Sequence, residues 1–157
     1  MGTVELRERL AAARERLRRI PATGPGEYGA PDPDTGERWN RGNVLGHVAE
    51  MLPFWTGQVQ AAAAGAEVLG RGEAGYAERK DGIAKGTVVP EMELRAEIDV
   101  AAAALDAVLA GLAPEALGRR VTYRRASGDK ELTLEAFLDH NLVGHFEQHL
   151  EQLDELS

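Results

Sequence analysis

The sequence contains no cysteine among its 157 residues. This absence excludes disulfides, thiolate metal ligands and a thiol nucleophile supplied by the chain itself. Aromatic residues make up only 5% of the chain, so aliphatic side chains must fill most of the core. No apolar run approaches the ~20 residues that a membrane-spanning helix needs. The opening stretch, MGTVELRERL, lacks the apolar core of a signal peptide, and the sequence therefore predicts a cytoplasmic protein.

The sequence also has few positive charges: it contains 18 lysines and arginines but 26 acidic residues, and its net charge is −8. Such a balance argues against nucleic-acid binding, which needs a cationic surface. Two locally basic stretches, ERLRRI and GRRVTYRR, are interpreted as solvated faces. A hydrophobic content of 43% and the chain length favour one globular domain over residues 1–157. The expected partner is therefore a small molecule, with no nucleic acid and no membrane.

Four segments place apolar residues three or four positions apart, the spacing of a helix with one buried face. The second segment begins near Asn40 or Asn43, either of which can cap it, and Pro53 predicts a kink inside it. The fourth is expected over residues 134–156, after a cap at Thr133. Long amphipathic helices joined by loops predict an all-α fold, specifically a four-helix bundle. The apolar positions of the first three segments are Leu6, Leu10, Ala13, Leu17 and Ile20; Val44, Val48, Met51, Leu52, Trp55, Val59 and Ala62; and Leu94, Ile98, Ala101, Leu105, Val108 and Leu112.

The connections carry three further signals. The stretches RVTYRR and KELTL flank the turn-forming ASGD, which predicts a small β-hairpin before the last helix. The stretch PATGPGEYGAPDPDTGE is too rich in proline and glycine for regular structure. It is either a functional lip or a connector that lets two helices run parallel. The stretch GRGEAGYAERKDGIAKGTVVP is interpreted as a long connection with room for a short helix.

Three of the four histidines lie within the stretch DHNLVGHFEQHLEQL. On a helical wheel with Leu134 at zero, His145 falls at about 20° and His149 at about 60°, inside the apolar arc. His140 falls at about 240°, on the polar side. Residues four positions apart are neighbours on one helix face, so His145 and His149 can bind a single metal ion. The alternative is a pair of core histidines that are hydrogen-bonded to buried partners. His140 is expected at the surface.

The fourth histidine, His47, lies at the flank of the buried face of the second helix. A ligand from a facing helix can occupy that position, although a histidine at the boundary of the core without a metal is the alternative. Glu50 lies one turn further and is a candidate catalytic residue, as a general base or as the group that orients His47. Its alternative is a solvated glutamate. Gln148 and Gln152 either hydrogen-bond near the site or belong to the polar surface.

The stretches WNRGNVLGHVAEM and LVGHFEQHLEQL resemble the two motifs of the DinB/YfiT-like superfamily. This superfamily includes the metal-binding domain of mycothiol-dependent maleylpyruvate isomerase. The resemblance implies an up-up-down-down four-helix bundle, often a homodimer. It also implies a divalent metal held by three histidines, which on this sequence are His47, His145 and His149. The additional C-terminal domain of the isomerases has no counterpart in this sequence, so the isomerase reaction is not the expected one.

Ligation by three neutral imidazoles suits Zn²⁺ best, with Ni²⁺, Fe²⁺ or Co²⁺ as alternatives, and it leaves positions for substrate. Such an ion lowers the pKa of bound water or of a bound thiol. Superfamily members with known activity include transferases and isomerases that use mycothiol, bacillithiol or glutathione. The expected function is therefore that of a divalent-metal-dependent thiol S-transferase that acts on small electrophiles with a mycothiol-like cosubstrate. The alternatives are a non-enzymatic metal-binding or dimerising bundle with a stress or regulatory role, and a bundle without metal.

Overall fold

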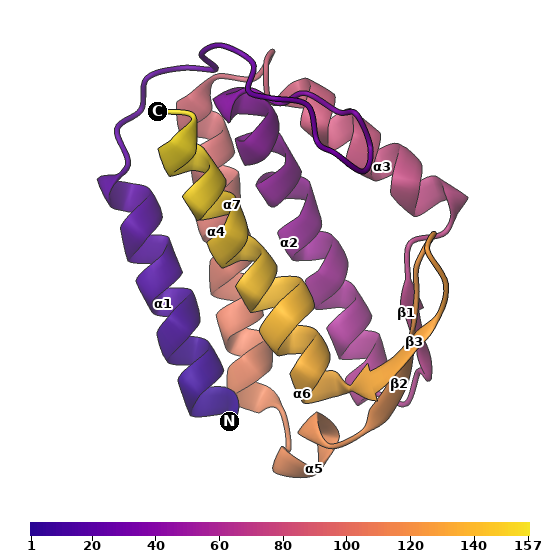
Figure 1. Ribbon diagram of the computed structural model, residues 1–157. Helices are drawn as coiled ribbons and strands as arrows, with labels where there is room; N and C mark the ends of the chain where they lie inside the picture. The colour runs from indigo at the N-terminus through magenta and orange to yellow at the C-terminus, as the bar shows by residue number, and fades with distance from the viewer.

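The computed structural model describes residues 1–157 and shows a mostly helical chain with a small three-stranded sheet (Figure 1). The prediction of an all-α chain is thus incomplete, while the predicted predominance of helices is confirmed. None of the helices combines the length and the apolar character needed to cross a membrane. The elements in chain order are α1 (Thr3–Arg19), α2 (Arg41–Ala63), β1 (Val68–Gly70), α3 (Glu73–Lys85), α4 (Glu91–Gly111), α5 (Pro114–Leu117), β2 (Arg120–Arg124), β3 (Lys130–Thr133), α6 (Leu134–Phe137), the π-helix η1 (Leu138–Val143) and α7 (Gly144–Glu155).

The long helical segments α1, α2, α4 and α6–η1–α7 lie side by side (Figure 1). Both α1 and α2 contact α4 on one side and α7 on the other. Helix α1 and the α6–α7 segment run in one direction, and α2 and α4 run in the opposite direction (Figure 1). The order along the chain is therefore up, down, down, up, which differs from the expected up-up-down-down order. The difference arises because β1 and α3 carry the chain back along the length of the molecule, so that α2 and α4 run parallel.

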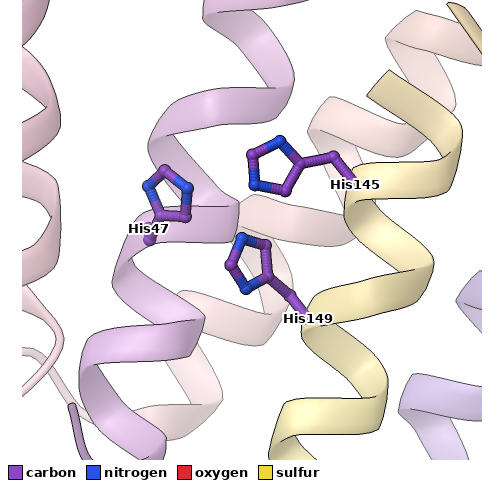
Figure 2. A group of neighbouring side chains, drawn as sticks. All are labelled: His47, His145 and His149. Atoms are coloured by element: carbon purple, nitrogen blue, oxygen red, sulfur yellow. The ribbon is translucent and has the colours of Figure 1, made fainter. Parts of the chain in front are cut away.

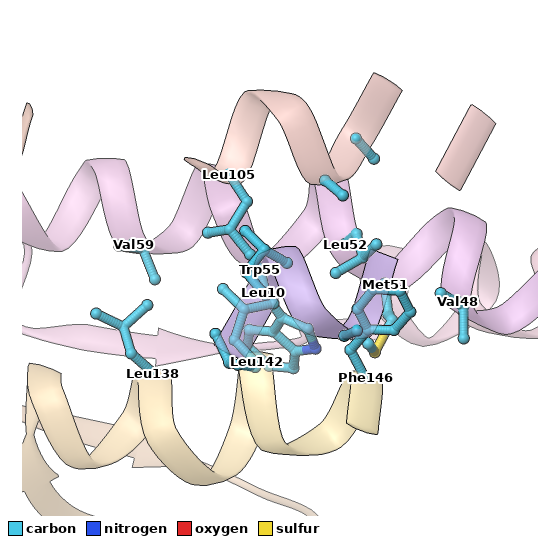
Figure 3. Packing of buried hydrophobic residues seen from close by; sticks show 14 of the residues in the cluster. Leu10, Val48, Met51, Leu52, Trp55, Val59, Leu105, Leu138, Leu142 and Phe146 are labelled. Carbon is cyan, nitrogen blue, oxygen red and sulfur yellow. The ribbon is translucent and has the colours of Figure 1, made fainter. Parts of the chain in front are cut away.

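The core lies between these four segments, and Figure 3 shows Leu10, Met51, Leu142 and Phe146 packed together within it. The predicted apolar stripes of α1 and α2 are buried along their whole length. The predicted stripe of α4 is buried as far as Leu105, and its last two residues, Val108 and Leu112, are partly buried. Helix α2 also starts where expected, because Asn40 and Asn43 each accept a hydrogen bond from the backbone of the other. It continues as a helix through Pro53.

The sheet has the strand order β1-β2-β3. Strands β2 and β3 form the predicted antiparallel hairpin, with Val121 opposite Leu132. Strand β1 pairs in parallel with β2, with Leu69 opposite Tyr123, and it was not predicted. Three residues are too few to show the alternation of apolar and polar side chains that marks a strand in sequence. The buried Leu69 side chain joins this strand to the core.

Helix α3 packs closely on α2 because glycines face one another across the contact. A Cβ atom placed on Gly42 would overlap the backbone of Gly86, and one on Gly46 would overlap the backbone of Gly82. The glycines that suggested a loop in this part of the sequence therefore permit backbone-to-backbone packing of two helices instead. This contact sets α3 beside the second turn of α2, where His47 lies.

Candidate metal centre

His47, His145 and His149 converge in the space between α2 and α7 (Figure 2). Each offers a ring nitrogen, and these atoms all lie within 4.8 Å of one another. The ring centroids of His145 and His149 are 4.6 Å apart, and that of His47 lies 4.8 Å from His149 and 5.6 Å from His145. His140 points away, with 71% of its side chain exposed, and contacts Asp139. The structure therefore brings together the three residues selected from the sequence and leaves the fourth at the surface.

The π-helix η1 immediately precedes the two histidines of α7. Gly144 donates its backbone N–H to the carbonyl of Asp139, five residues earlier, and a Cβ atom on Gly144 would overlap that oxygen. A helical wheel that runs unbroken from Leu134 thus misses a change of phase at η1. The pairing of His145 with His149 is unaffected, because both residues follow the π-helix and lie one turn apart within α7.

All three imidazoles are held neutral by their surroundings. Burial lowers the pKa of His47 to about 2, with further contributions from His145 and Arg79. Burial is also the first cause that lowers the pKa of His145, followed by the charge of Arg79. The pKa of His149 lies well below its ordinary value, chiefly through burial and then through the other two histidines. Neutral imidazole is the form that binds a metal ion, so no proton has to leave these rings near neutral pH.

Two ring nitrogens in this group have no hydrogen-bond partner although they are buried. One is Nε2 of His149, whose Nδ1 is hydrogen-bonded to Oε1 of Gln152 at 3.0 Å. The other is Nδ1 of His47, which lies 2.9 Å from Oε1 of Glu50 without the alignment of a hydrogen bond. Buried polar atoms are usually paired, and each unpaired one costs free energy. An unpaired nitrogen at the point where three imidazoles meet, here Nε2 of His149, fits a divalent metal ion better than it fits simple core packing.

Glu50 lies against the site and is not a solvated glutamate. Arg71 donates to both of its oxygens, at 2.7 Å to Oε1 and 3.0 Å to Oε2. Burial is the largest cause that raises the pKa of Glu50. The Arg71 guanidinium is itself fixed by the carbonyl of Gly75 and lies 4.3 Å above the centre of the Phe54 ring. Because Arg71 engages both carboxylate oxygens, the geometry favours an orienting role of Glu50 toward His47 over that of a free base.

Sequence reasoning missed Arg71 because it lies between β1 and α3, in a glycine-rich stretch without periodicity. It also gave no means to separate the two glutamines that flank the histidine pair. Gln152 contacts His149, and Gln148 is exposed to solvent.

Trp39, which precedes the cap of α2, stacks on the ring of His149 with ring centroids 5.8 Å apart. It also contacts the ring of His47 at a tilted angle, with ring centroids 5.1 Å apart. This tryptophan covers the outer side of the histidine group.

A cavity of about 540 Å³ opens beside the three histidines. Its walls include the rings of Trp39, Trp55, Tyr76 and Tyr123 and the guanidinium-bearing side chain of Arg79. Arg79 is paired with Glu37 at 3.1 Å. Part of the rim comes from the proline-rich loop after α1, around residues 29–37. The sequence left two interpretations of this loop: the lip of a site, or a connector that lets two helices run parallel. The structure agrees with the first, because the loop joins two antiparallel helices, α1 and α2.

The comparisons with known proteins agree on one fold for this chain. Residues 4–153 match the sequence model of the DinB superfamily. Two solved structures are similar: the mycothiol-dependent maleylpyruvate isomerase, with a TM-score of 0.67, and a histidine-to-alanine mutant of it, with 0.66. Each is 19% identical in sequence and covers 98% of this chain, whereas this chain spans 63% of theirs. At this identity the likeness concerns the fold alone. No protein of curated function matches the chain.

Proposed function

Because the chain belongs to the DinB superfamily, we propose that it is a divalent-metal-dependent enzyme that transfers a low-molecular-weight thiol to small electrophiles. The single observation that carries this proposal is the convergence of three neutral, partly unpaired imidazoles beside a cavity of about 540 Å³. Three protein ligands leave a coordination position for substrate, which is typical of catalytic rather than structural metal sites.

His47, His145 and His149 are the residues that would hold the ion. Nitrogen ligands of this kind suit Zn²⁺ best, and Ni²⁺, Fe²⁺ or Co²⁺ are alternatives. When bound, the ion supplies Lewis acidity that lowers the pKa of a coordinated thiol. The four long helical segments serve in this proposal as a four-helix bundle whose rigid packing fixes the distance between α2 and α7. Sites on rigid helices hold their geometry better than sites on loops.

The other side chains around the cavity have roles of their own in this proposal. The rings of Trp39, Trp55 and Tyr123 give the space beside the histidines an apolar wall. The same walls hold a small electrophile close to the thiol, which replaces a bimolecular encounter by a positioned reaction. Glu50, held by Arg71, orients the ring of His47. The chain has no cysteine, so the thiol must arrive as a cosubstrate.

The expectation of a mycothiol-like thiol draws support from the name of the similar solved structure, a mycothiol-dependent isomerase. The isomerase reaction is not carried over, because this chain spans only 63% of that protein. Cytoplasmic location and a homodimer stay predictions, and light scattering coupled to size exclusion tests the second. A metal that saturates its coordination with protein ligands alone would favour the non-enzymatic alternative.

The first experiment measures metal content. Protein purified without an affinity tag and reconstituted with Zn²⁺ is expected to hold about one equivalent per chain. His47→Ala, His145→Ala and His149→Ala should each lose most of that affinity. His140→Ala is the matched control, because its side chain is exposed on the same helical segment. Less than a tenth of an equivalent in the reconstituted wild type would overturn the proposal, as would unchanged affinity in His145→Ala.

The second experiment measures chemistry. Mycothiol, bacillithiol and glutathione are each tested with a chlorinated aromatic electrophile, with and without metal. Conjugation is expected to require metal and to be lost in His149→Ala while His140→Ala keeps the wild-type rate. A fully metallated protein that accelerates none of these reactions would point to the metal-binding, non-enzymatic alternative.

A further inference from the structure

His149 is the only histidine of the group with a well-aligned side-chain partner on Nδ1. Oε1 of Gln152 lies 3.0 Å from that nitrogen, one helical turn further along α7. The opposite nitrogen, Nε2, is buried and has no partner of any kind. The ring of His149 is additionally fixed between Trp39 on one face and His145 on the other, at ring-centroid distances of 5.8 and 4.6 Å. The ring is therefore held in place, and the remaining question is which nitrogen carries the proton.

The contact with Gln152 answers that question. If the amide oxygen faces Nδ1, then Nδ1 carries the proton and donates it, and Nε2 presents a lone pair. If the amide were turned to present its NH₂ group, Nε2 would carry the proton. That N–H would then be buried without an acceptor, since nothing accepts a hydrogen bond at Nε2. The first arrangement leaves the lone pair directed toward the space shared with His47 and His145, where a ligand atom is needed.

The other two histidines have no equivalent side-chain hydrogen bond. Gln148 stands three residues after His145, as Gln152 does after His149, but its side chain is exposed. Glu50 stands three residues after His47, and its oxygen lies close to Nδ1 without hydrogen-bond alignment. Glu50 is moreover engaged by Arg71. Gln152 is thus the one residue whose side-chain hydrogen bond sets the tautomer of a histidine in this group.

We propose that Gln152 is a positioning residue of the metal centre: its amide oxygen accepts the Nδ1 proton of His149 and so fixes Nε2 as the ligand atom. This inference rests on the proposed metal site, and it adds a residue outside the three histidines that determines metal affinity. Hydrogen bonds from the outer nitrogen of a ligating histidine orient the ring and increase its basicity. Loss of such a partner typically weakens metal binding about 10- to 100-fold.

The test uses three variants of the full chain and Zn²⁺ as the probe, with affinity measured by competition against a chelator. Gln152→Met removes the acceptor and keeps the side-chain length, so binding should weaken about 10- to 100-fold. Gln152→Glu keeps an oxygen acceptor but cannot donate, so it should retain affinity within about threefold of wild type. Gln148→Met makes the same change at the exposed position on the same helix and should bind as wild type does.

A second readout separates positioning from a loss of structure. The visible absorption of Co²⁺-loaded protein reports ligand geometry, and it should change in Gln152→Met while Gln152→Glu and Gln148→Met keep the wild-type spectrum. Thermal unfolding of the metal-free variants shows whether each still folds. Equal affinity and an identical spectrum in Gln152→Met would overturn the inference, and failure of Gln152→Glu to rescue would show that Gln152 donates instead. If wild-type protein binds no metal, the proposed function itself has failed, and the two failures are distinguishable.

Discussion

Gly42 in α2 and Gly86 just after α3 meet through their backbones, with no room for a side chain on either residue. The same close approach recurs one turn along, between Gly46 and Gly82. These two contacts hold α3, and with it the wall of the cavity, against the helix that carries His47.

A methyl group at these contacts should therefore destabilise the protein. We expect Gly46→Ala to lower the free energy of unfolding by about 1–3 kcal/mol, the usual cost of overpacking. Gly57→Ala is the matched control in the same helix, because nothing lies within 4 Å of its added Cβ. It should stabilise by about 0.5–1 kcal/mol, since alanine favours the helix over glycine. Urea denaturation of the metal-free proteins measures both, and equal effects of the two substitutions would contradict the close packing.

A second prediction concerns Arg41, which holds the start of the loop that forms the rim of the cavity. Its side chain is almost wholly buried and is paired with Glu91 at 2.8 Å. It also donates to the carbonyl oxygens of Pro21 and Gly24, which lie at the start of the loop. Arg41→Met removes this ion pair and leaves the Gly24 carbonyl oxygen without its arginine donor, while Glu91 keeps its ion pair with Arg95, so the substitution should cost about 1–3 kcal/mol.

The loop should become a protease target in Arg41→Met, with cleavage in residues 21–40 detected by mass spectrometry. Glu91→Met alone leaves the buried Arg41 guanidinium without its carboxylate, so the double variant Arg41→Met with Glu91→Met should lose less stability than the sum of the two single variants. If the effects of the two single substitutions simply add in the double variant, the ion pair is not the source of the effect.

Gly144 should be indispensable to the π-helix. An added Cβ would overlap the carbonyl of Asp139, so Gly144→Ala must shift the turn that precedes His145. We expect a loss of about 1–3 kcal/mol in stability, together with weaker Zn²⁺ binding because the two histidines of α7 move relative to His47. Calorimetric titration and urea denaturation provide the two measurements. Wild-type metal affinity in this variant would show that α7 is positioned independently of η1.

Lowering the pH should destabilise the metal-free protein already at pH values higher than those at which carboxylates titrate. The pKa of His47 is lowered from 6.5 to about 2, and that of His149 also lies well below 6.5. As the pH falls through 6.5, the unfolded chain takes up protons on these histidines and the folded chain does not. Stability is thus fully present above the unfolded pKa and is lost toward acid, by at most about 1.4 kcal/mol per pH unit for each histidine.

This dependence is measured with chelator present, by denaturation between pH 7.5 and 5.5. His47→Gln should reduce the slope of stability against pH, because the group that resists protonation has been removed. His140→Ala should leave the slope unchanged, since that histidine is exposed in the folded chain. A wild-type stability that is constant over this range would show that the buried imidazoles do not stay neutral.

Periodicity alone sufficed for α1 and for α2, which carries His47, because Leu6 to Ile20 and Val44 to Ala62 repeat at helical spacing over four turns or more. It also selected His145 and His149, since their pairing depends only on one turn of α7. It could not reveal β1, which is three residues long, or α3, whose glycines are needed for packing rather than for a turn. Arg71 was missed, and Gln152 could not be distinguished from Gln148, for a further reason. Their roles depend on contacts across space that the spacing of residues does not determine.

The histidine group joins two parts of the chain that are about 100 residues apart in sequence. A chain without cysteine has no covalent cross-link, so an ion between α2 and α7 would act as a removable one. Because the site does not exist in the unfolded chain, the ion would add stability in proportion to the logarithm of its concentration above Kd. Its removal would loosen the seam between α2 and α7 first. Metal supply would then set how strongly α2 and α7 are held together.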